Sequence, residues 1–206
     1  MNMLMGLRLW FGPRRAHSWQ RMIETRGSTV RHTLNIVDSV PSRHSLGILQ
    51  ILNDAIVTST ALYEYVPRTM ESMVPWFEEK AKKNCPVLVA VDEKDAVLGF
   101  ATYGPFRTFP AYKYTIEHSV YVERGHRGKG IGMALLRHLV MRATAQEYHV
   151  MVGVVDARNE ASIALHERAG FRRAGVLREV GYKFSGWLYV AFYELALPTP
   201  VDPVEG

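Results

Sequence analysis

Hydrophobic and polar residues recur along this chain with two different periods. Apolar residues spaced three or four positions apart predict helices over 43–57, 69–83, 131–147 and 159–170. Short runs rich in β-branched and aromatic residues predict strands over 32–39, 86–92, 96–103, 115–123 and 149–157, and residues 171–197 alternate enough for two more strands around Gly186. The order β-α-α-β-β-β-α-β-α-β-β indicates an α/β domain with a mixed central sheet of about seven strands.

The chain divides into three parts by composition. Residues 1–31 carry six arginines and one glutamate, which accounts for the whole net charge of +5. Residues 32–197 contain the periodic segments and are predicted to form one domain. Because residues 32–206 carry no net charge, we expect no nucleic-acid partner. Residues 198–206 are rich in proline and are expected to form a loose tail.

Composition also bounds the location of the protein. Cys85 is the only cysteine, so intrachain disulfides are impossible, and we expect it to pack against its neighbours. No apolar run approaches the roughly 18 residues typical of a membrane span. We expect a cytoplasmic protein without a metal site. The Arg-rich residues 1–31 leave open a transit peptide, a loose extension and an upstream start before Met22.

The stretch ERGHRGKGIGMALLRHLV, residues 123–140, joins a predicted strand to a predicted helix. Backbone N–H groups at a helix N-terminus attract anions, and glycine lets an anion approach them closely. A Walker P-loop would require Ser or Thr after Lys129, and a dinucleotide fingerprint would require a third glycine that is absent. The remaining spacing, Arg127-x-x-Gly130-x-Gly132, resembles the pyrophosphate loop of the GNAT acetyltransferases. An ordinary glycine-rich turn is the alternative.

Four further segments carry the same resemblance, most closely to the phosphinothricin and methionine sulfoximine N-acetyltransferases. They are NDAIVTSTALYE (53–64), GPFRTFPAYKYTIEHSVYV (104–122), ARNEASIALHERAGF (157–171) and VGYKFSGWLYVAF (180–192). With the loop HRGKGIG (126–132), the resemblance covers about residues 32–197. It implies the GNAT acyl-CoA N-acyltransferase fold, acetyl-CoA as co-substrate, a small amino acid or analogue as acceptor, and a homodimer.

The resemblance also implies which residues contact acetyl-CoA. The backbone of three strand residues is expected to pair with the pantetheine arm, and Asn159 is expected to contact the same arm unless it only caps its helix. The loop is expected to hold the pyrophosphate. The strand residues are Val120, Tyr121 and Val122, and the loop residues are Arg127, Gly128, Lys129, Gly130, Ile131 and Gly132.

Two residues are candidates for the chemistry itself. An acceptor amine must lose a proton before it attacks a thioester, and Glu117, in the strand before the glycine-rich loop, is a candidate general base. In the resembled enzymes the matching glutamate has that role. His166 takes the position at which most GNAT sequences have a tyrosine, the usual candidate acid for the leaving thiolate. It either donates that proton, orients the base, or only packs near the cofactor.

Phe106 and Arg107 lie eleven and ten residues before Glu117 and match an aromatic-Arg pair near the acceptor in the resembled enzymes. An arginine suits the carboxylate of an amino-acid acceptor, although a solvated loop arginine is the plain alternative. Two other functions stay open: acetylation of a peptide N-terminus or another amine such as a polyamine, and a non-catalytic acyl-CoA-binding module. The basic, aromatic loop favours the amino acid over a polyamine.

Overall fold

A computed structural model describes residues 34–205 of the chain. The predicted basic extension, residues 1–31, and the first residues of the first predicted strand lie outside this part. The strands are β1 (Asn35–Asp38), β2 (Val87–Val91), β3 (Val97–Pro105), β4 (Thr115–Val122), β5 (Val150–Asp156), β6 (Arg172–Lys183) and β7 (Gly186–Ala196). The helices are α1 (Pro41–Thr58), α2 (Met70–Lys82), α3 (Ile131–Ala145) and α4 (Glu160–Arg168), with short 3-10 turns η1 (Pro110–Tyr112) and η2 (Arg124–His126).

The strands form one seven-stranded sheet in the order β1-β2-β3-β4-β5-β7-β6. All neighbouring strands are antiparallel except β4 and β5, which are parallel. Helix α3 connects this parallel pair, as a crossover between parallel strands requires. The predicted mixed sheet and element order are therefore confirmed.

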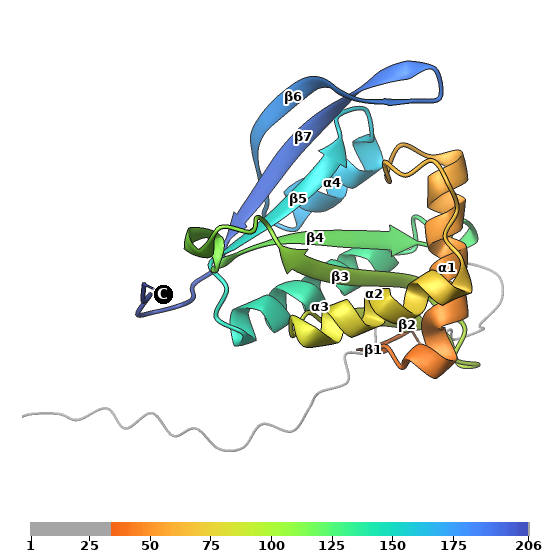
Figure 1. Cartoon of the computed structure of the whole chain (residues 1–206), viewed down its shortest axis with the longest axis horizontal. Helices are drawn as coiled ribbons and strands as arrows, with labels where there is room; N and C mark the ends of the chain where they lie inside the picture. Colours follow the sequence, from red (N-terminus) through yellow and green to blue (C-terminus); the bar gives the residue numbers. More distant parts are fainter. Residues whose placement is uncertain (1–33, 206) are drawn as a thin grey trace, which may run out of the picture. The chain divides into compact units, whose positions relative to one another are not determined.

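Helices cover both faces of the sheet, and the alternation of side chains along β2 explains how. Leu88 and Ala90 belong to a core cluster with the apolar stripe of α3. Val87, Val89 and Val91 belong to a second cluster with α1 and α2. All five residues of this strand are buried, as expected for a strand between two helical layers. Figure 1 shows α1 and α2 at one face of the strands and α3 at the other.

The predicted helix boundaries agree with the structure to within a few residues. Thr69 occupies the N-cap position of α2, although its side chain makes no capping hydrogen bond there. The predicted stripe of α3 is buried, with Leu135, Leu136 and Leu139 fully enclosed. Cys85 is buried in the same cluster, so the packing role expected for it is confirmed.

The turn between β6 and β7 differs from its prediction. Gly186 begins β7, and the turn itself is made by Phe184 and Ser185, whose φ angles are 51° and 59°. Two successive positive φ values match the right-handed twist of a hairpin. Glycine usually supplies such angles, so the sequence favours a turn at Gly186. The two long strands project beyond the rest of the sheet as a hairpin (Figure 1).

The C-terminal segment makes hydrogen bonds to residues beside β4 and β5. Thr199 donates its hydroxyl to the carbonyl of Tyr148 at 2.6 Å, and His149 Nδ1 donates to the carbonyl of Thr199 at 2.8 Å. Further on, the N–H of Val204 donates to the Tyr114 hydroxyl at 3.0 Å. Three hydrogen bonds therefore attach Thr199 and Val204 to residues beside β4 and β5, and the looseness of the tail stays a prediction.

Candidate active site

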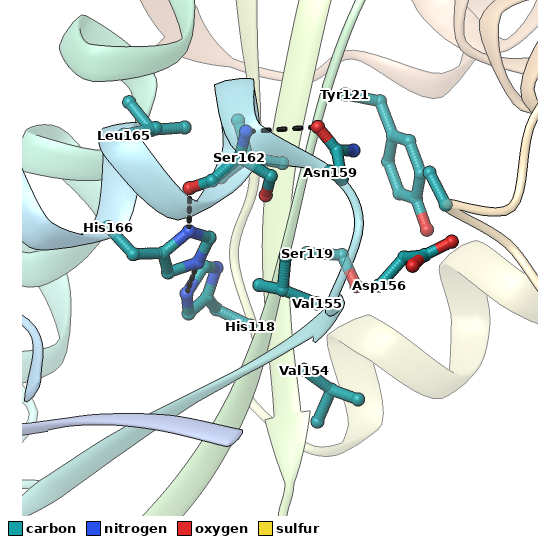
Figure 2. A pocket seen from close by; sticks show the side chains of 12 residues that line it. His118, Ser119, Tyr121, Val154, Val155, Asp156, Asn159, Ser162, Leu165 and His166 are labelled. Carbon is teal, nitrogen blue, oxygen red and sulfur yellow. Dashed lines mark hydrogen bonds between the residues drawn. The ribbon is translucent and has the colours of Figure 1, made fainter. Parts of the chain in front are cut away.

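The parallel strands β4 and β5 separate before either of them ends. Their pairing stops at His118 opposite Gly153, yet β4 continues to Val122 and β5 to Asp156. A cleft of about 480 Å³, part of it open to solvent, lies where they diverge. Residues of β4, β5, α4 and the α1–α2 connection line it: Ala61, His118, Ser119, Val120, Tyr121, Val154, Val155, Asp156, Asn159, Ser162, Leu165 and His166. Figure 2 shows the side chains of this lining.

The diverging part of β4 offers backbone groups to the cleft. The N–H of Glu123 donates to Leu98 O at 2.9 Å, and the N–H of Phe106 donates to Thr115 O at 3.2 Å. Hydrogen-bonded pairs alternate along antiparallel strands, so these bonds turn the odd-numbered residues of β4 toward β3. The backbone of Val120 and Val122 therefore faces the cleft. The backbone of Tyr121 is turned to β3 instead, which differs from the expectation that all three residues offer backbone groups; its side chain lines the cleft.

The glycine-rich loop has the backbone conformation that an anion site needs. Gly128 has φ 76°, and Gly130, the N-cap of α3, has φ 82°. Residues other than glycine rarely adopt this left-handed backbone conformation. A Cβ built at either position would meet no atom within 4 Å, so the space in front of the N-terminus of α3 is open. Gly132 lies in the first turn of α3 beside Leu165 and Val122, where a Cβ would find ordinary contacts at 3.5 and 3.6 Å.

Two arginines of this loop are held by one carboxylate of α1. Arg124 Nη2 lies 3.1 Å from Asp54 Oδ1, and Arg127 Nη2 lies 3.6 Å from Asp54 Oδ2. Arg127 also donates through Nε to the carbonyl of Val122 at 3.1 Å. Lys129 is exposed. These cations raise the positive potential around the N-terminus of α3 and favour an anionic ligand.

Helix α4 begins beside the cleft. The side chain of Asn159 accepts a hydrogen bond from the N–H of Ser162 at 3.0 Å and so caps the helix (Figure 2). This is the structural role that the sequence left open for Asn159. The cap uses only the carbonyl oxygen of the side chain, and the amide nitrogen stays at the cleft, which Asn159 also lines.

His166 forms a buried pair with His118, which the sequence did not predict. Their Nε2 atoms lie 3.2 Å apart and the rings are stacked with centroids 5.1 Å apart. His166 Nδ1 lies 2.7 Å from the carbonyl of Ser162, which accepts only, so Nδ1 carries the hydrogen. By this assignment His118 donates from Nε2 to His166, and its own Nδ1, which is buried, has no partner. A Cβ on Gly153 would lie 2.6 Å from His166 Nε2, so only glycine leaves room for the pair.

Both histidines are held neutral. Desolvation by burial and, to a smaller extent, the neighbouring His166 lower the pKa of His118 to about 3. Burial also lowers the pKa of His166, although the carbonyl of Ser162 opposes this shift. In this arrangement both nitrogens of His166 are engaged within the protein. The geometry therefore favours an orienting and packing role for His166 over donation of a proton.

Glu117 lies on the opposite face of β4 from this pair. Ile116 belongs to the core beneath α3, whereas Tyr121 packs in the cluster beneath α1 and α2. Side chains alternate along a strand, so Glu117 shares its face with Ser119 and Tyr121. The Glu117 side chain is 39% exposed. Desolvation raises the pKa of its carboxyl, and the positive charge of Arg107 partly opposes this shift.

Arg107 lies beside this carboxylate. Its Nη1 is 3.8 Å from Glu117 Oε2 and donates to the carbonyl of Phe106 at 2.6 Å. Its guanidinium also lies over the ring of Phe106, 4.0 Å from the centroid. The structure thus brings together Glu117, Arg107 and Phe106, which the sequence singled out for the acceptor side. None of the three lines the cleft between β4 and β5; Arg107 lines a separate hollow of about 440 Å³ with residues of the loop before β4.

Several residues around the cleft carried no sequence signal. Lys183 is buried, and its ammonium group donates to the carbonyls of Ser59 at 3.0 Å and Leu62 at 2.6 Å, which ties the β6–β7 hairpin to the α1–α2 connection. Asp156 lines the cleft from β5. Lys183 and Asp156 are single polar residues that belong to no recognisable sequence motif. Only the alternation of VVDA in a buried strand hints that Asp156 faces away from the core.

Comparison with known proteins identifies the class to which this fold and cleft belong. The sequence profile of the acetyltransferase (GNAT) family matches residues 53–171. The chain is therefore a member of the GNAT family of acetyltransferases, and the predicted family and fold are confirmed.

Proteins similar to this chain over most of its length are named acetyltransferases. An L-methionine sulfoximine/L-methionine sulfone acetyltransferase from Pseudomonas aeruginosa is 45% identical over 76% of this chain and 92% of its own. A phosphinothricin N-acetyltransferase from Streptomyces viridochromogenes is 35% identical over 76% of this chain and 86% of its own. The crystal structure of a phosphinothricin acetyltransferase from Sinorhizobium meliloti in complex with acetyl-CoA is 33% identical, has a TM-score of 0.79, and covers 84% of this chain and 93% of that one.

Two classes of feature were not found in the part of the chain that the structure describes. Residues 34–205 contain no helix long and apolar enough to cross a membrane. The same residues contain no group of three or more His, Cys, Asp or Glu side chains placed to hold a metal ion.

Proposed function

We propose that the protein transfers the acetyl group of acetyl-CoA to the α-amino group of a small amino acid or analogue of the methionine sulfone, methionine sulfoximine or phosphinothricin type. The observation that carries this proposal is the divergence of β4 and β5 between an open helix N-terminus and a half-buried carboxylate. The helix N-terminus suits a pyrophosphate, and the carboxylate of Glu117 suits removal of a proton from the acceptor. The names of the relatives at 45% and 35% identity support the acceptor class.

The residues present fit the co-substrate. The backbone of Val120 and the N–H of Val122 can pair with the pantetheine amides because β5 has separated from β4, whereas the carbonyl of Val122 accepts from Arg127. The N-terminus of α3 and the cations of the loop would hold the pyrophosphate. Acetyl-CoA supplies the acetyl group as an activated thioester.

In the proposed mechanism, Glu117 takes a proton from the acceptor ammonium, directly or through a water. Burial raises the pKa of Glu117, which makes it a stronger base than an ordinary carboxylate. The neutral amine then attacks the thioester carbonyl, and a backbone N–H of β4 stabilises the negative charge on that oxygen. The carbon–sulfur bond breaks, coenzyme A leaves as a thiolate, and the nitrogen releases its second proton to water or to that thiolate. His166 keeps α4 and β4 in register through the pair with His118 rather than supplying the proton to the leaving thiolate.

Arg107 is the proposed partner of the acceptor carboxylate, because its planar fork already lies beside Glu117. Arg107→Ala should raise KM for a free amino acid by about tenfold to a hundredfold, as expected for one charge-assisted contact. KM for acetyl-CoA should barely change. Steady-state kinetics measure both values, with Arg137→Ala, an exposed arginine of α3, as the matched control.

The substrate itself provides a second control for Arg107. The amide of the same amino acid lacks the carboxylate, so wild type should acetylate it poorly and Arg107→Ala should not change its KM. Equal wild-type activity on acid and amide would contradict the carboxylate contact. It would favour the alternative acceptors, a peptide N-terminus or another amine.

We propose that the protein is a homodimer that pairs through β6. This strand is at the edge of the sheet, and its residues 172–180 are all exposed, including Val176, Leu177 and Val180. An edge strand presents unpaired backbone N–H and C=O groups that can pair with another chain. Light scattering should give twice the chain mass of 23.4 kDa, and Leu177→Glu should give the monomer mass. A monomeric wild type at micromolar concentration would contradict this proposal.

A turnover assay across a panel of amines tests the proposed function. Release of free thiol from acetyl-CoA should be fastest with methionine sulfone, methionine sulfoximine or phosphinothricin. Fast release with peptides or polyamines instead would favour the second acceptor class. Binding of acetyl-CoA without turnover on any amine would favour a non-catalytic acyl-CoA-binding module.

A further inference from the structure

Asp156 ends β5 at the cleft and is only 8% exposed. Along β5, Met151 and Val155 belong to the core beneath α3, so Asp156 points to the opposite face of the sheet. That face carries Glu117 and Tyr121 on β4. Asp156 and Tyr121 line the cleft together, on the side away from the histidine pair (Figure 2). This face of the sheet therefore carries a carboxylate on each of the two strands, Asp156 in the lining of the cleft and Glu117 on β4 outside that lining.

The charge of Asp156 is not balanced by a neighbouring cation in the part of the chain that the structure describes. Its Oδ1 accepts the N–H of Arg158 at 2.8 Å, and it takes part in none of the ion pairs among residues 34–205. Two basic groups on either side of the contact between the β6–β7 hairpin and the α1–α2 connection are occupied: Lys183 of β6 binds two backbone carbonyls, and Arg68 of the connection pairs with Glu64. Removing a carboxylate from water without a cation is costly.

We infer that Asp156 determines the specificity for the acceptor by binding its protonated amino group as it enters the cleft. This inference rests on the proposed function. An α-amino group is mostly an ammonium at neutral pH, and a shielded carboxylate attracts it more strongly than water-exposed groups do. The ammonium then loses its proton to Glu117, and the nitrogen lone pair attacks the thioester carbonyl. Asp156 thus binds the acceptor ammonium, whereas Glu117 accepts a proton from it.

The test is Asp156→Asn, which removes the charge but keeps a side-chain oxygen for the N–H of Arg158. KM for the amino-acid acceptor should rise about tenfold or more, the usual loss for one charge-assisted contact. kcat and KM for acetyl-CoA should stay within about twofold. The matched control is Asp38→Asn on β1, a 63%-exposed carboxylate that pairs with Arg142 and should leave all three constants unchanged.

Two outcomes would overturn the inference. The first is an unchanged acceptor KM in Asp156→Asn. The second is a rise in KM for acetyl-CoA alone, which would place Asp156 beside the pantetheine arm. Absence of turnover in wild type would instead contradict the proposed function, so the two failures are distinguishable.

A wild-type experiment covers the case in which Asp156→Asn fails to fold. A small primary alkylammonium ion should inhibit competitively against the acceptor, and the alcohol of the same size should not. The ammonium ion can pair with the carboxylate of Asp156, whereas the alcohol has no charge with which to do so. Equal inhibition by both compounds, or inhibition by neither, would overturn the inference.

Discussion

Glu117→Gln should lower kcat by about a hundredfold or more while acetyl-CoA affinity changes little. The substitution keeps the shape of the side chain and removes its basicity. In wild type, kcat/KM should fall as the pH drops through the pKa of Glu117, because only the carboxylate accepts a proton. Desolvation raises this pKa, so the acid limb should lie above the range of an ordinary glutamate. Glu117→Gln should lose that limb.

Two comparisons make this prediction specific. Arg107 lowers the pKa of Glu117, so Arg107→Ala should move the acid limb to higher pH. Glu78→Gln on α2, an exposed glutamate, should change neither rate nor profile. A Glu117→Gln enzyme with the wild-type pH profile would remove Glu117 from the mechanism.

Gly130→Val should weaken acetyl-CoA binding by about tenfold to a hundredfold, as expected for losing one charge-assisted contact to the pyrophosphate. Gly130 has φ 82°, and a β-branched residue in this left-handed conformation costs about 1–2 kcal/mol. A side chain there would also stand in the open space before the N-terminus of α3. Isothermal titration calorimetry with acetyl-CoA measures the affinity, and thermal unfolding measures the cost to stability.

Two further variants separate these causes. Gly130→Asn tolerates the left-handed conformation, so a loss of affinity in this variant reports the blocked approach of the anion. Gly170→Val introduces similar strain after α4, where φ is 95°, and should lower stability without changing affinity. A folded Gly130→Val protein that binds acetyl-CoA normally would show that the loop does not hold the pyrophosphate.

The fold was largely predictable because its elements have strong periods. The stripe of Leu135, Leu136 and Leu139 defined α3 to within two residues of its end. Turns were less predictable: Phe184 and Ser185 adopt conformations that their residue types do not favour. The contacts of Thr199 and Val204 were not predictable because their partners, Tyr148 and Tyr114, are distant in sequence.

The site was predictable where a short motif carries it and unpredictable where the topology assembles it. Gly130 and Glu117 lie on one strand-loop-helix unit, so local spacing identifies them. The pair of His118 and His166 exists only because parallel pairing places Gly153 beside His118. Asp156 reaches the cleft because β5 leaves β4, and no local pattern in the sequence determines where two paired strands separate.

The central claim is acetyl transfer to an amino-acid nitrogen, and product analysis tests it most directly. The protein is incubated with acetyl-CoA and methionine sulfone, free thiol is counted, and the product is identified by mass spectrometry. The account predicts one N-acetyl methionine sulfone for each thiol released, and almost none with Glu117→Gln. Thiol release without an N-acetylated product, or equal product from wild type and Glu117→Gln, would contradict it.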